Sequence, residues 1–196
     1  MYYFHHMLPR KIIPLFLLYF LTSGNTVSAP ATSAANVYII KKSVVSFHSN
    51  AKSELIKATS GELKGIIDAD KRIFAFSVAM KSFAGFNSPL QEEHFNENYM
   101  ESDKYPTASF TGHIIEEDDF TKDGNYNIRA KGKLNVHGVE QERILQGDLV
   151  VKNGTIKLSS IFTVLLSEHD IKIPRIVHEK LASEIKVILD AEFIKK

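Results

Sequence analysis

Apolar and polar residues alternate along most of this chain, which is the pattern of β-strands with one buried and one solvated face. The clearest run spans residues 126–136, where apolar or small residues occupy every second position and Asn, Arg and Lys occupy the others. A second run, residues 52–67, is interrupted by Gly61, which predicts a bend or bulge. The sequence predicts eight strands, over residues 37–47, 52–67, 72–80, 107–115, 126–136, 139–151, 155–166 and 183–194.

A helical pattern replaces the alternation once, between the third and fourth predicted strands. Ser88 can cap a helix whose first residue is Pro89, and two acidic residues follow near the positive end of the helix dipole. Tyr105 precedes a proline and therefore favours an extended conformation, from which the next strand resumes. The sequence predicts a short helix over residues 88–100, inserted into an all-β protein.

Phe95 and Tyr99 lie four positions apart in this insertion and are expected to share one helix face. We expect this face to cover one opening of the fold rather than join a sheet, because a barrel lip offers apolar surface. The helix is then either a lid that admits a ligand or a plug that shields the core. The acidic residues Glu92, Glu93 and Glu97 are expected to face water.

Eight antiparallel strands joined mostly by short turns can close into an up-and-down barrel or stack as a sandwich. An eight-stranded barrel has an interior that is filled by side chains or holds one small ligand. Small residues on the buried faces, among them Gly112, Ala130 and Gly132, indicate either an open lumen or the tight corners of a closed sheet. The residues alone leave both interpretations open. If the lumen is open, its wall is expected to be formed by Phe74, Phe76, Val78, Phe110, Leu134 and Phe162.

Two blocks in the chain resemble the YceI-like family. The first is His94-Phe95 followed by residues 101–110, ESDKYPTASF, and the second is residues 132–139, GKLNVHGV. The resemblance covers residues 36 to 193 and implies a lipocalin-like antiparallel barrel that holds a polyisoprenoid or another long lipid. At the end of the seventh strand many relatives carry Asp-Tyr-Gly or Asp-Phe-Gly, whereas this chain has Glu168-His169-Asp170.

The first 31 residues resemble a secretory signal peptide. Arg10 and Lys11 precede an apolar run over residues 12–21, and small residues follow, so we expect cleavage between residues 29 and 35. The run is shorter than the roughly 20 residues that span a bilayer, which argues against an uncleaved anchor. Met7 is an alternative start. The expected mature domain covers residues 36–196 and is periplasmic or secreted, without a stable membrane anchor.

Charge and cysteine content narrow the function classes. Without Arg10 and Lys11, 24 − 2 = 22 basic residues face 23 acidic ones, which argues against a nucleic-acid partner held by bulk charge. The absence of cysteine excludes disulfides, a thiolate nucleophile and a lipid-modified cysteine. The sequence does not define an oligomeric state.

The histidines show neither the helical nor the strand spacing that aims two imidazoles at one metal, so we expect no metal and no other cofactor. Adjacent strand residues such as Ser167, His169 and Asp170 do not supply triad geometry. His137 either bonds a ligand head group at the barrel mouth or serves the turn it forms with Gly138.

The first functional hypothesis is an exported, non-enzymatic protein that holds an isoprenoid or other long apolar chain in its lumen. One alternative is an enzyme or metal-dependent factor that uses His94, His137 and Glu168 at the barrel end. Another is a stress-related interaction module with a filled barrel.

Overall fold

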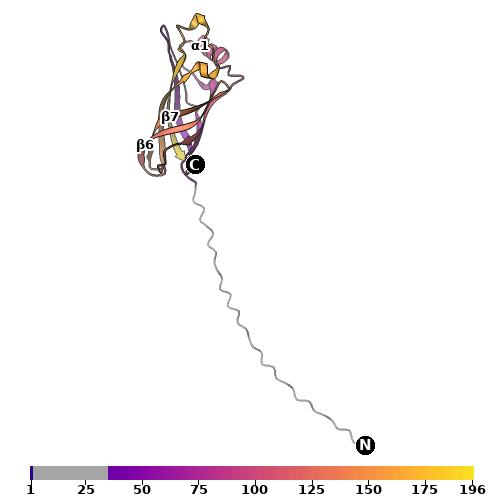
Figure 1. Ribbon diagram of the computed structural model, residues 1–196, viewed down its shortest axis with the longest axis vertical. Coiled ribbons are helices and arrows are strands. Elements are labelled where there is room, and N and C mark those ends of the chain that lie inside the picture. The colour runs from indigo at the N-terminus through magenta and orange to yellow at the C-terminus, as the bar shows by residue number, and fades with distance from the viewer. Residues whose placement is uncertain (2–34) are drawn as a thin grey trace. The chain divides into compact units, whose positions relative to one another are not determined.

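The computed structural model describes Met1 and residues 35–196 (Figure 1). The predicted signal peptide therefore lies outside the described residues. The strands are β1 (Val37–Asn50), β2 (Leu55–Ser60), β3 (Lys64–Asp68), β4 (Ile73–Ala79), β5 (Thr107–Ile114), β6 (Gly124–Val136), β7 (Val139–Lys152), β8 (Thr155–Leu165) and β9 (Glu184–Lys195).

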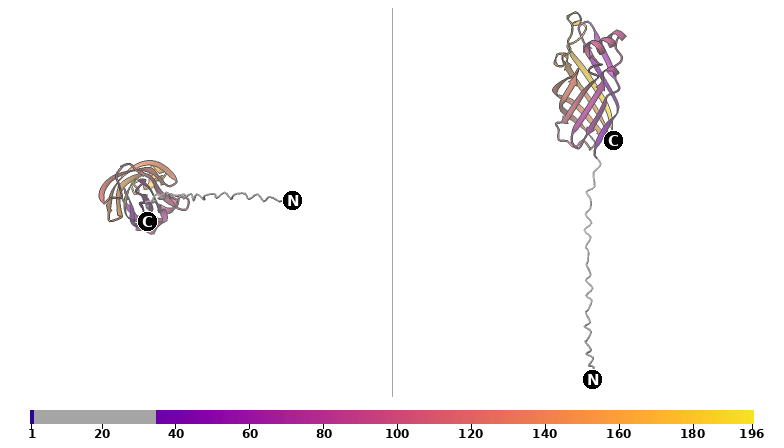
Figure 2. Two further views of the ribbon diagram at one scale, coloured as in Figure 1. Left: turned by 90° about the horizontal axis from the view of Figure 1, so that it is seen from below. Right: turned by 90° about the vertical axis from the view of Figure 1, so that its right-hand side faces the viewer.

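The strands form one antiparallel sheet that closes on itself, because β1 pairs with β9 at one edge and with β2 and β3 at the other. The order is otherwise sequential, and the strands surround a common centre when seen from below (Figure 2). β2 pairs with the end of β1 and β3 with its beginning, so the two act as one bent strand broken near Gly61. The predicted eight-stranded barrel with a bend at this glycine is confirmed.

The alternation of the sequence sets which side chains enter the barrel. In β6, Ile128 and Leu134 are buried whereas Arg129, Lys131 and Lys133 are exposed. In β1 the alternation changes register at a bulge between Ile40 and Lys42, where the sequence places two consecutive lysines. The buried side chains of the strands therefore share the interior of the barrel.

Two hairpins have the turns that the sequence predicts. His137 and Gly138 have φ angles of 53° and 75°, and Asn153 and Gly154 have φ angles of 50° and 71°. Consecutive positive φ values are those of a type I′ turn, which glycine and asparagine accept at low cost. The interpretation of His137 as a turn residue thus fits the backbone.

The helical insertion lies between β4 and β5. These are the third and fourth strands of the barrel when β2 and β3 are counted as one bent strand. It consists of an α-helix, α1 (Pro89–His94), and a π-helical turn, η2 (Phe95–Tyr99). The Ser88 hydroxyl accepts a hydrogen bond from the Gln91 amide, as expected of a cap. α1 lies at one end of the barrel (Figure 1), which we call the helical end.

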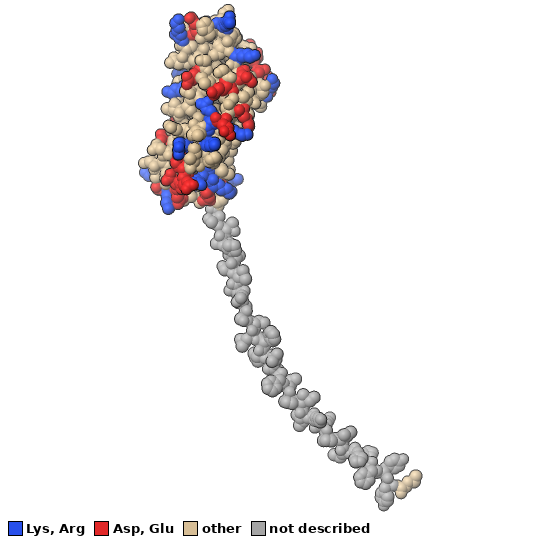
Figure 3. Space-filling view, viewed as in Figure 1, with Lys and Arg blue, Asp and Glu red and all other residues tan. Residues whose placement is uncertain are grey.

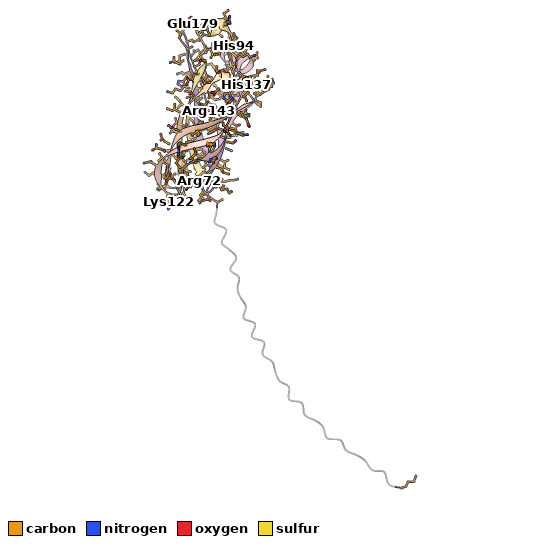
Figure 4. All side chains as sticks on the ribbon, viewed as in Figure 1. Arg72, His94, Lys122, His137, Arg143 and Glu179 are labelled. Carbon is orange, nitrogen blue, oxygen red and sulfur yellow. The ribbon has the colours of Figure 1, made fainter. Side chains whose placement is uncertain are left out.

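The opposite end, which holds the chain termini of the barrel and the turns β3–β4, β5–β6 and β7–β8, is filled by side chains. Phe120 of the β5–β6 loop is 1% exposed and meets the ring of Tyr126 edge-on, with centroids 5.2 Å apart. Phe193 and Ile156 are fully buried in the strands beside it. We call this the closed end; Arg72 and Lys122 mark it in Figure 4, and His94 and Glu179 mark the helical end.

Carboxylates with lowered pKa values gather at the closed end. Hydrogen bonds from Lys71 lower the pKa of Asp68, and those from Asn36 lower the pKa of Asp70. Burial alone raises the pKa of Glu116, but hydrogen bonds from the Arg129 backbone and side chain outweigh it and lower the value. A carboxyl group whose pKa is lowered in the folded protein stabilises the fold at pH values above its pKa in the unfolded chain. This stabilisation is lost as the pH falls through the pKa of the same group in the folded protein.

We therefore expect the thermal unfolding midpoint to fall as the pH is lowered from about 5 to about 2, and the closed end to loosen first. Hydrogen exchange of amides in the β3–β4 and β5–β6 connections should rise before that of β8. Asp68→Asn should flatten the pH dependence of the midpoint. Parallel curves for this variant and the wild type would contradict the assignment.

Candidate functional site

A cavity of about 520 Å³ occupies the barrel between the filled closed end and the helical end. This volume lies within the roughly 300–1,000 Å³ of ligand pockets. Inward side chains of nearly every strand line it, and most are aliphatic or aromatic. The barrel is thus not filled by its own side chains.

The aromatic wall of the cavity comes from β4 and β5. The rings of Phe74 and Phe76 stack with centroids 5.3 Å apart, and Phe74 also meets Phe110 at 5.0 Å. Phe76 and Phe110 are paired across the two strands, which fixes their rings on the same face. These packed rings form a preorganised surface for an apolar chain.

A second aromatic cluster closes the helical end over the cavity. Phe95 lies 5.1 Å from Phe47 of β1, 5.2 Å from Phe86 and 6.0 Å from Phe83, measured between ring centroids. Tyr99 is half-buried beside this cluster, and burial raises the pKa of its hydroxyl, so the group stays neutral at physiological pH. As predicted, Phe95 and Tyr99 face the barrel.

Several polar groups of the cavity wall lie at the helical end, whereas Gln146 and Ser160 line it midway along β7 and β8. Gln91 of α1 donates a hydrogen bond to the Glu54 carboxylate ahead of β2, and His94 and Lys180 lie on the same rim. An Asn87 side-chain amide donates to the Leu55 carbonyl at 3.0 Å. These bonds tie the insertion to β2, whose outer edge also pairs with Ala84 through Thr59.

The structure brings most of the predicted site residues to one cavity. Seven of the wall candidates line it, together with both residues of the insertion. Gly112 and Gly132 are not among the lining residues, because the space that a side chain would need there is taken by the neighbouring backbone. The lining candidates are Phe74, Phe76, Val78, Phe110, Ala130, Leu134, Phe162, Phe95 and Tyr99.

His137 lies outside the cavity wall, in a polar network. Its Nδ1 is 3.1 Å from the His169 carbonyl oxygen and its Nε2 is 2.8 Å from a Glu101 carboxylate oxygen. Both nitrogens therefore lie within hydrogen-bond distance of protein oxygens. Both are engaged within the protein, so this geometry does not favour the head-group role considered for His137.

The residues described contain no group of three or more His, Cys, Asp or Glu side chains that could hold a metal ion. Glu168 pairs with Arg143 at 2.8 Å, whereas His137 pairs with Glu101. The alternative that combines His94, His137 and Glu168 at one metal therefore lacks its ligand cluster in the described part of the chain.

Some site residues escaped the sequence analysis. Phe83 and Phe86 complete the aromatic cluster from the segment that precedes α1, and Met100 is buried directly after η2. Phe120, which lies outside the cavity at the closed end, also escaped the sequence analysis; the available signal was a single large apolar residue after an acidic run. Leu181 reaches the cavity from the β8–β9 connection.

The fold and this cavity define the class of protein: a closed antiparallel β-barrel with an apolar interior. Residues 32–193 match the YceI-like domain family. The chain belongs to the YceI-like family, as the two sequence blocks predicted. A search of curated protein sequences found no match.

Three solved structures share the fold at low sequence identity. A polyisoprenoid binding domain from Saccharophagus degradans, implicated in plant cell wall breakdown, has a TM-score of 0.69 at 13% identity, covering 81% of this chain and 98% of that one. Burkholderia cenocepacia BcnA has a TM-score of 0.63 at 14% identity, covering 76% and 95%. A Campylobacter jejuni YCEI protein has a TM-score of 0.53 at 15% identity, covering 66% and 78%.

None of the helices in the described part of the chain is long and apolar enough to span a membrane. On the face shown in Figure 3, basic and acidic side chains are interspersed, with uncharged surface between them.

Proposed function

We propose that this protein is an exported, non-enzymatic carrier that holds an isoprenoid or another long apolar chain in the barrel lumen. The observation that carries the proposal is the apolar cavity of about 520 Å³ inside the closed barrel. The polyisoprenoid-binding activity named for the Saccharophagus degradans domain supports the choice of ligand class. The signal-like pattern of residues 1–31 supports export.

Apolar burial supplies the main attraction for such a ligand. Each buried CH₂ contributes about 0.8 kcal/mol, so a chain with ten to fifteen buried carbons gains roughly 8–12 kcal/mol. Association costs about 4–15 kcal/mol in lost freedom, so the affinity depends on how great a length of chain is buried. The wall recognises apolar length, and the polar rim with Glu54, Gln91 and His94 recognises the head of the ligand.

The direct test is mass spectrometry of organic extracts from the full chain, purified without detergent from a native exporting host. The expected result is a long-chain isoprenoid or other lipid in stoichiometric amount. The delipidated protein should then take up cis-parinaric acid, a polyene whose fluorescence rises in apolar surroundings. Failure to recover lipid, together with failure to take up the polyene, would overturn the proposal.

Filling the lumen should abolish binding. Ala130 lines the cavity from β6, so Ala130→Phe is expected to place a ring in the lumen and weaken polyene binding at least about tenfold. Lys131→Phe adds the same ring one position along, on the exposed outer face, and should leave the affinity unchanged. Equal affinities for the two variants would place the ligand outside the lumen.

A further inference from the structure

The seam between β7 and β8 is incompletely paired. β7 and β8 are hydrogen-bonded from Lys152↔Thr155 only as far as Asp148↔Ser159. The neighbouring seams continue to the helical end, where Val136 pairs with Val139 and Leu165 with Glu184. Within these two described strands, residues 142–147 and 160–165 would extend the ladder but form no pairs. Six unpaired positions leave a window about 20 Å long.

Side chains, not backbone pairs, close this β7–β8 window. Arg143 donates from Nη2 to the Thr163 carbonyl oxygen at 2.9 Å and from Nη1 to a Glu168 carboxylate oxygen at 2.8 Å. At the lower corner the Ser160 hydroxyl donates to the Gln146 carbonyl oxygen. Arg143 thus spans the gap halfway along the barrel, where it is labelled in Figure 4.

The upper border of the window is the turn that follows β8, η3 (Leu166–His169). The Gln141 side-chain amide donates to the Glu168 carbonyl oxygen at 2.8 Å, and Nδ1 of the buried His169 donates to the Val139 carbonyl oxygen at 3.0 Å. These bonds hold the turn against β7. The window is therefore a bounded opening with a fixed frame.

The window leads into the apolar cavity. Leu145 and Gly147 on β7 and Phe162 on β8 line the cavity along its inner side. Outside, three large apolar side chains flank it: Ile144 is 57% exposed, Ile161 is 61% exposed and Leu165 is 38% exposed. An apolar chain that passes sideways through the window would contact apolar groups on both sides and at its edge.

We propose that the β7–β8 window is the lateral portal through which the apolar chain enters and leaves the lumen, and that Arg143 is its latch. This inference rests on the proposed lipid-binding function. The Arg143–Glu168 pair is partly exposed, with side chains 24% and 39% accessible, and ion pairs of this kind are weak. The latch can therefore open without the loss of any backbone pairing, which passage through the fully paired β6–β7 or β8–β9 seam would require.

Releasing the latch should speed exchange in both directions. Arg143→Met keeps an unbranched side chain but removes both hydrogen bonds and the charge. We expect the association and dissociation rates of cis-parinaric acid, measured by stopped-flow fluorescence, to rise together about two- to fivefold at nearly constant Kd. Lys133→Met is the matched control, because its ion pair with Glu140 joins the outer faces of β6 and β7, which are fully paired.

A covalent lock provides the opposite test. The chain has no cysteine, so Ile144→Cys with Thr163→Cys allows a short cleavable bismaleimide to bridge the window alone. We expect exchange to slow at least about tenfold when the bridge is present and to recover when the bridge is cleaved. Thr163→Cys with Lys186→Cys, bridged by the same reagent across the complete β8–β9 seam, should exchange at the wild-type rate.

The outcomes separate the portal from the function on which it rests. If wild-type protein binds the polyene but the window bridge leaves exchange unchanged, the portal is wrong and the chain enters at the helical end. If wild-type protein binds neither native lipid nor polyene, the proposed function fails and the portal fails with it. Circular dichroism of each variant should confirm an intact barrel before the rates are compared.

Discussion

Replacement of Gly112 by alanine is expected to destabilise the barrel by about 3 kcal/mol or more, the upper range for overpacking a filled interior. A Cβ at this position would lie 2.1 Å from the Lys131 carbonyl oxygen and 2.6 Å from the Gly132 Cα. Both are backbone atoms of β6, so β5 and β6 would have to move apart. Urea unfolding followed by circular dichroism measures the loss.

The close approach at Gly112 is reciprocal. Gly132 is its register partner, and a Cβ on Gly132 would lie 2.3 Å from the Thr111 carbonyl oxygen. β5 and β6 thus approach each other closely here, as at a barrel corner, and the Phe110 ring packs over Gly132. The interpretation of such residues as corner glycines therefore accounts for this pair.

Gly61→Ala is the matched control for Gly112→Ala. It has ordinary space, since the nearest atom to its Cβ would be the Ser43 carbonyl oxygen at 3.7 Å. We expect a change within about 0.5 kcal/mol, typical of substitutions outside strained sites. Equal losses of stability at the two positions would mean that the destabilisation comes from chain entropy or strand propensity rather than from the close approach of β5 and β6.

The sequence predicts those parts of the fold that depend on local order. The alternation in β6 sets its inner and outer faces, the Asn153-Gly154 pair sets a hairpin, and Ser88-Pro89 sets the start of α1. Each signal acts over a few residues and depends little on the rest of the chain. Together, these signals define the eight strands of the barrel and their order.

Features that depend on the distance between strands do not appear in the sequence pattern. Apolar and polar residues alternate in the same way in the paired parts of β7 and β8, residues 148–152 and 155–159, and in their unpaired parts, residues 142–147 and 160–165. Inward position predicts that Ala130 lines the lumen, and it predicts the same for Gly112, whose surroundings are backbone. Whether a small inward residue opens space depends on how closely the next strand approaches, which is a property of the closed barrel.

The same limit applies to the closed end. Phe120 lies in a loop whose charged residues predict exposure, yet it is almost completely buried against Tyr126. The hydroxyl of Tyr126 donates to the Lys122 carbonyl oxygen at 3.0 Å, which holds the loop over the barrel. This loop closes the lumen at that end, so any ligand must enter at the helical end or through the wall.

The insertion at the helical end is expected to act as a plug rather than a lid. Phe95→Ala should lower the free energy of unfolding by about 3 kcal/mol, as large-to-small changes in a packed core do. The reason is the four-ring cluster of Phe47, Phe83, Phe86 and Phe95, which joins η2 and the segment before α1 to β1. Tyr99→Ala should cost less, because Tyr99 lies outside these ring pairs.

Ligand exchange distinguishes the two roles. A plug predicts that the cis-parinaric acid rates of the Phe95→Ala variant stay within about twofold of the wild type, because the chain passes elsewhere. A lid predicts the reverse: rates that rise severalfold with little lost stability. Glu93→Ala, on the exposed face of α1, is the control and should change neither quantity. Faster exchange at unchanged stability in the Phe95→Ala variant would establish the helical end as the gate and leave the β7–β8 window without a role in entry.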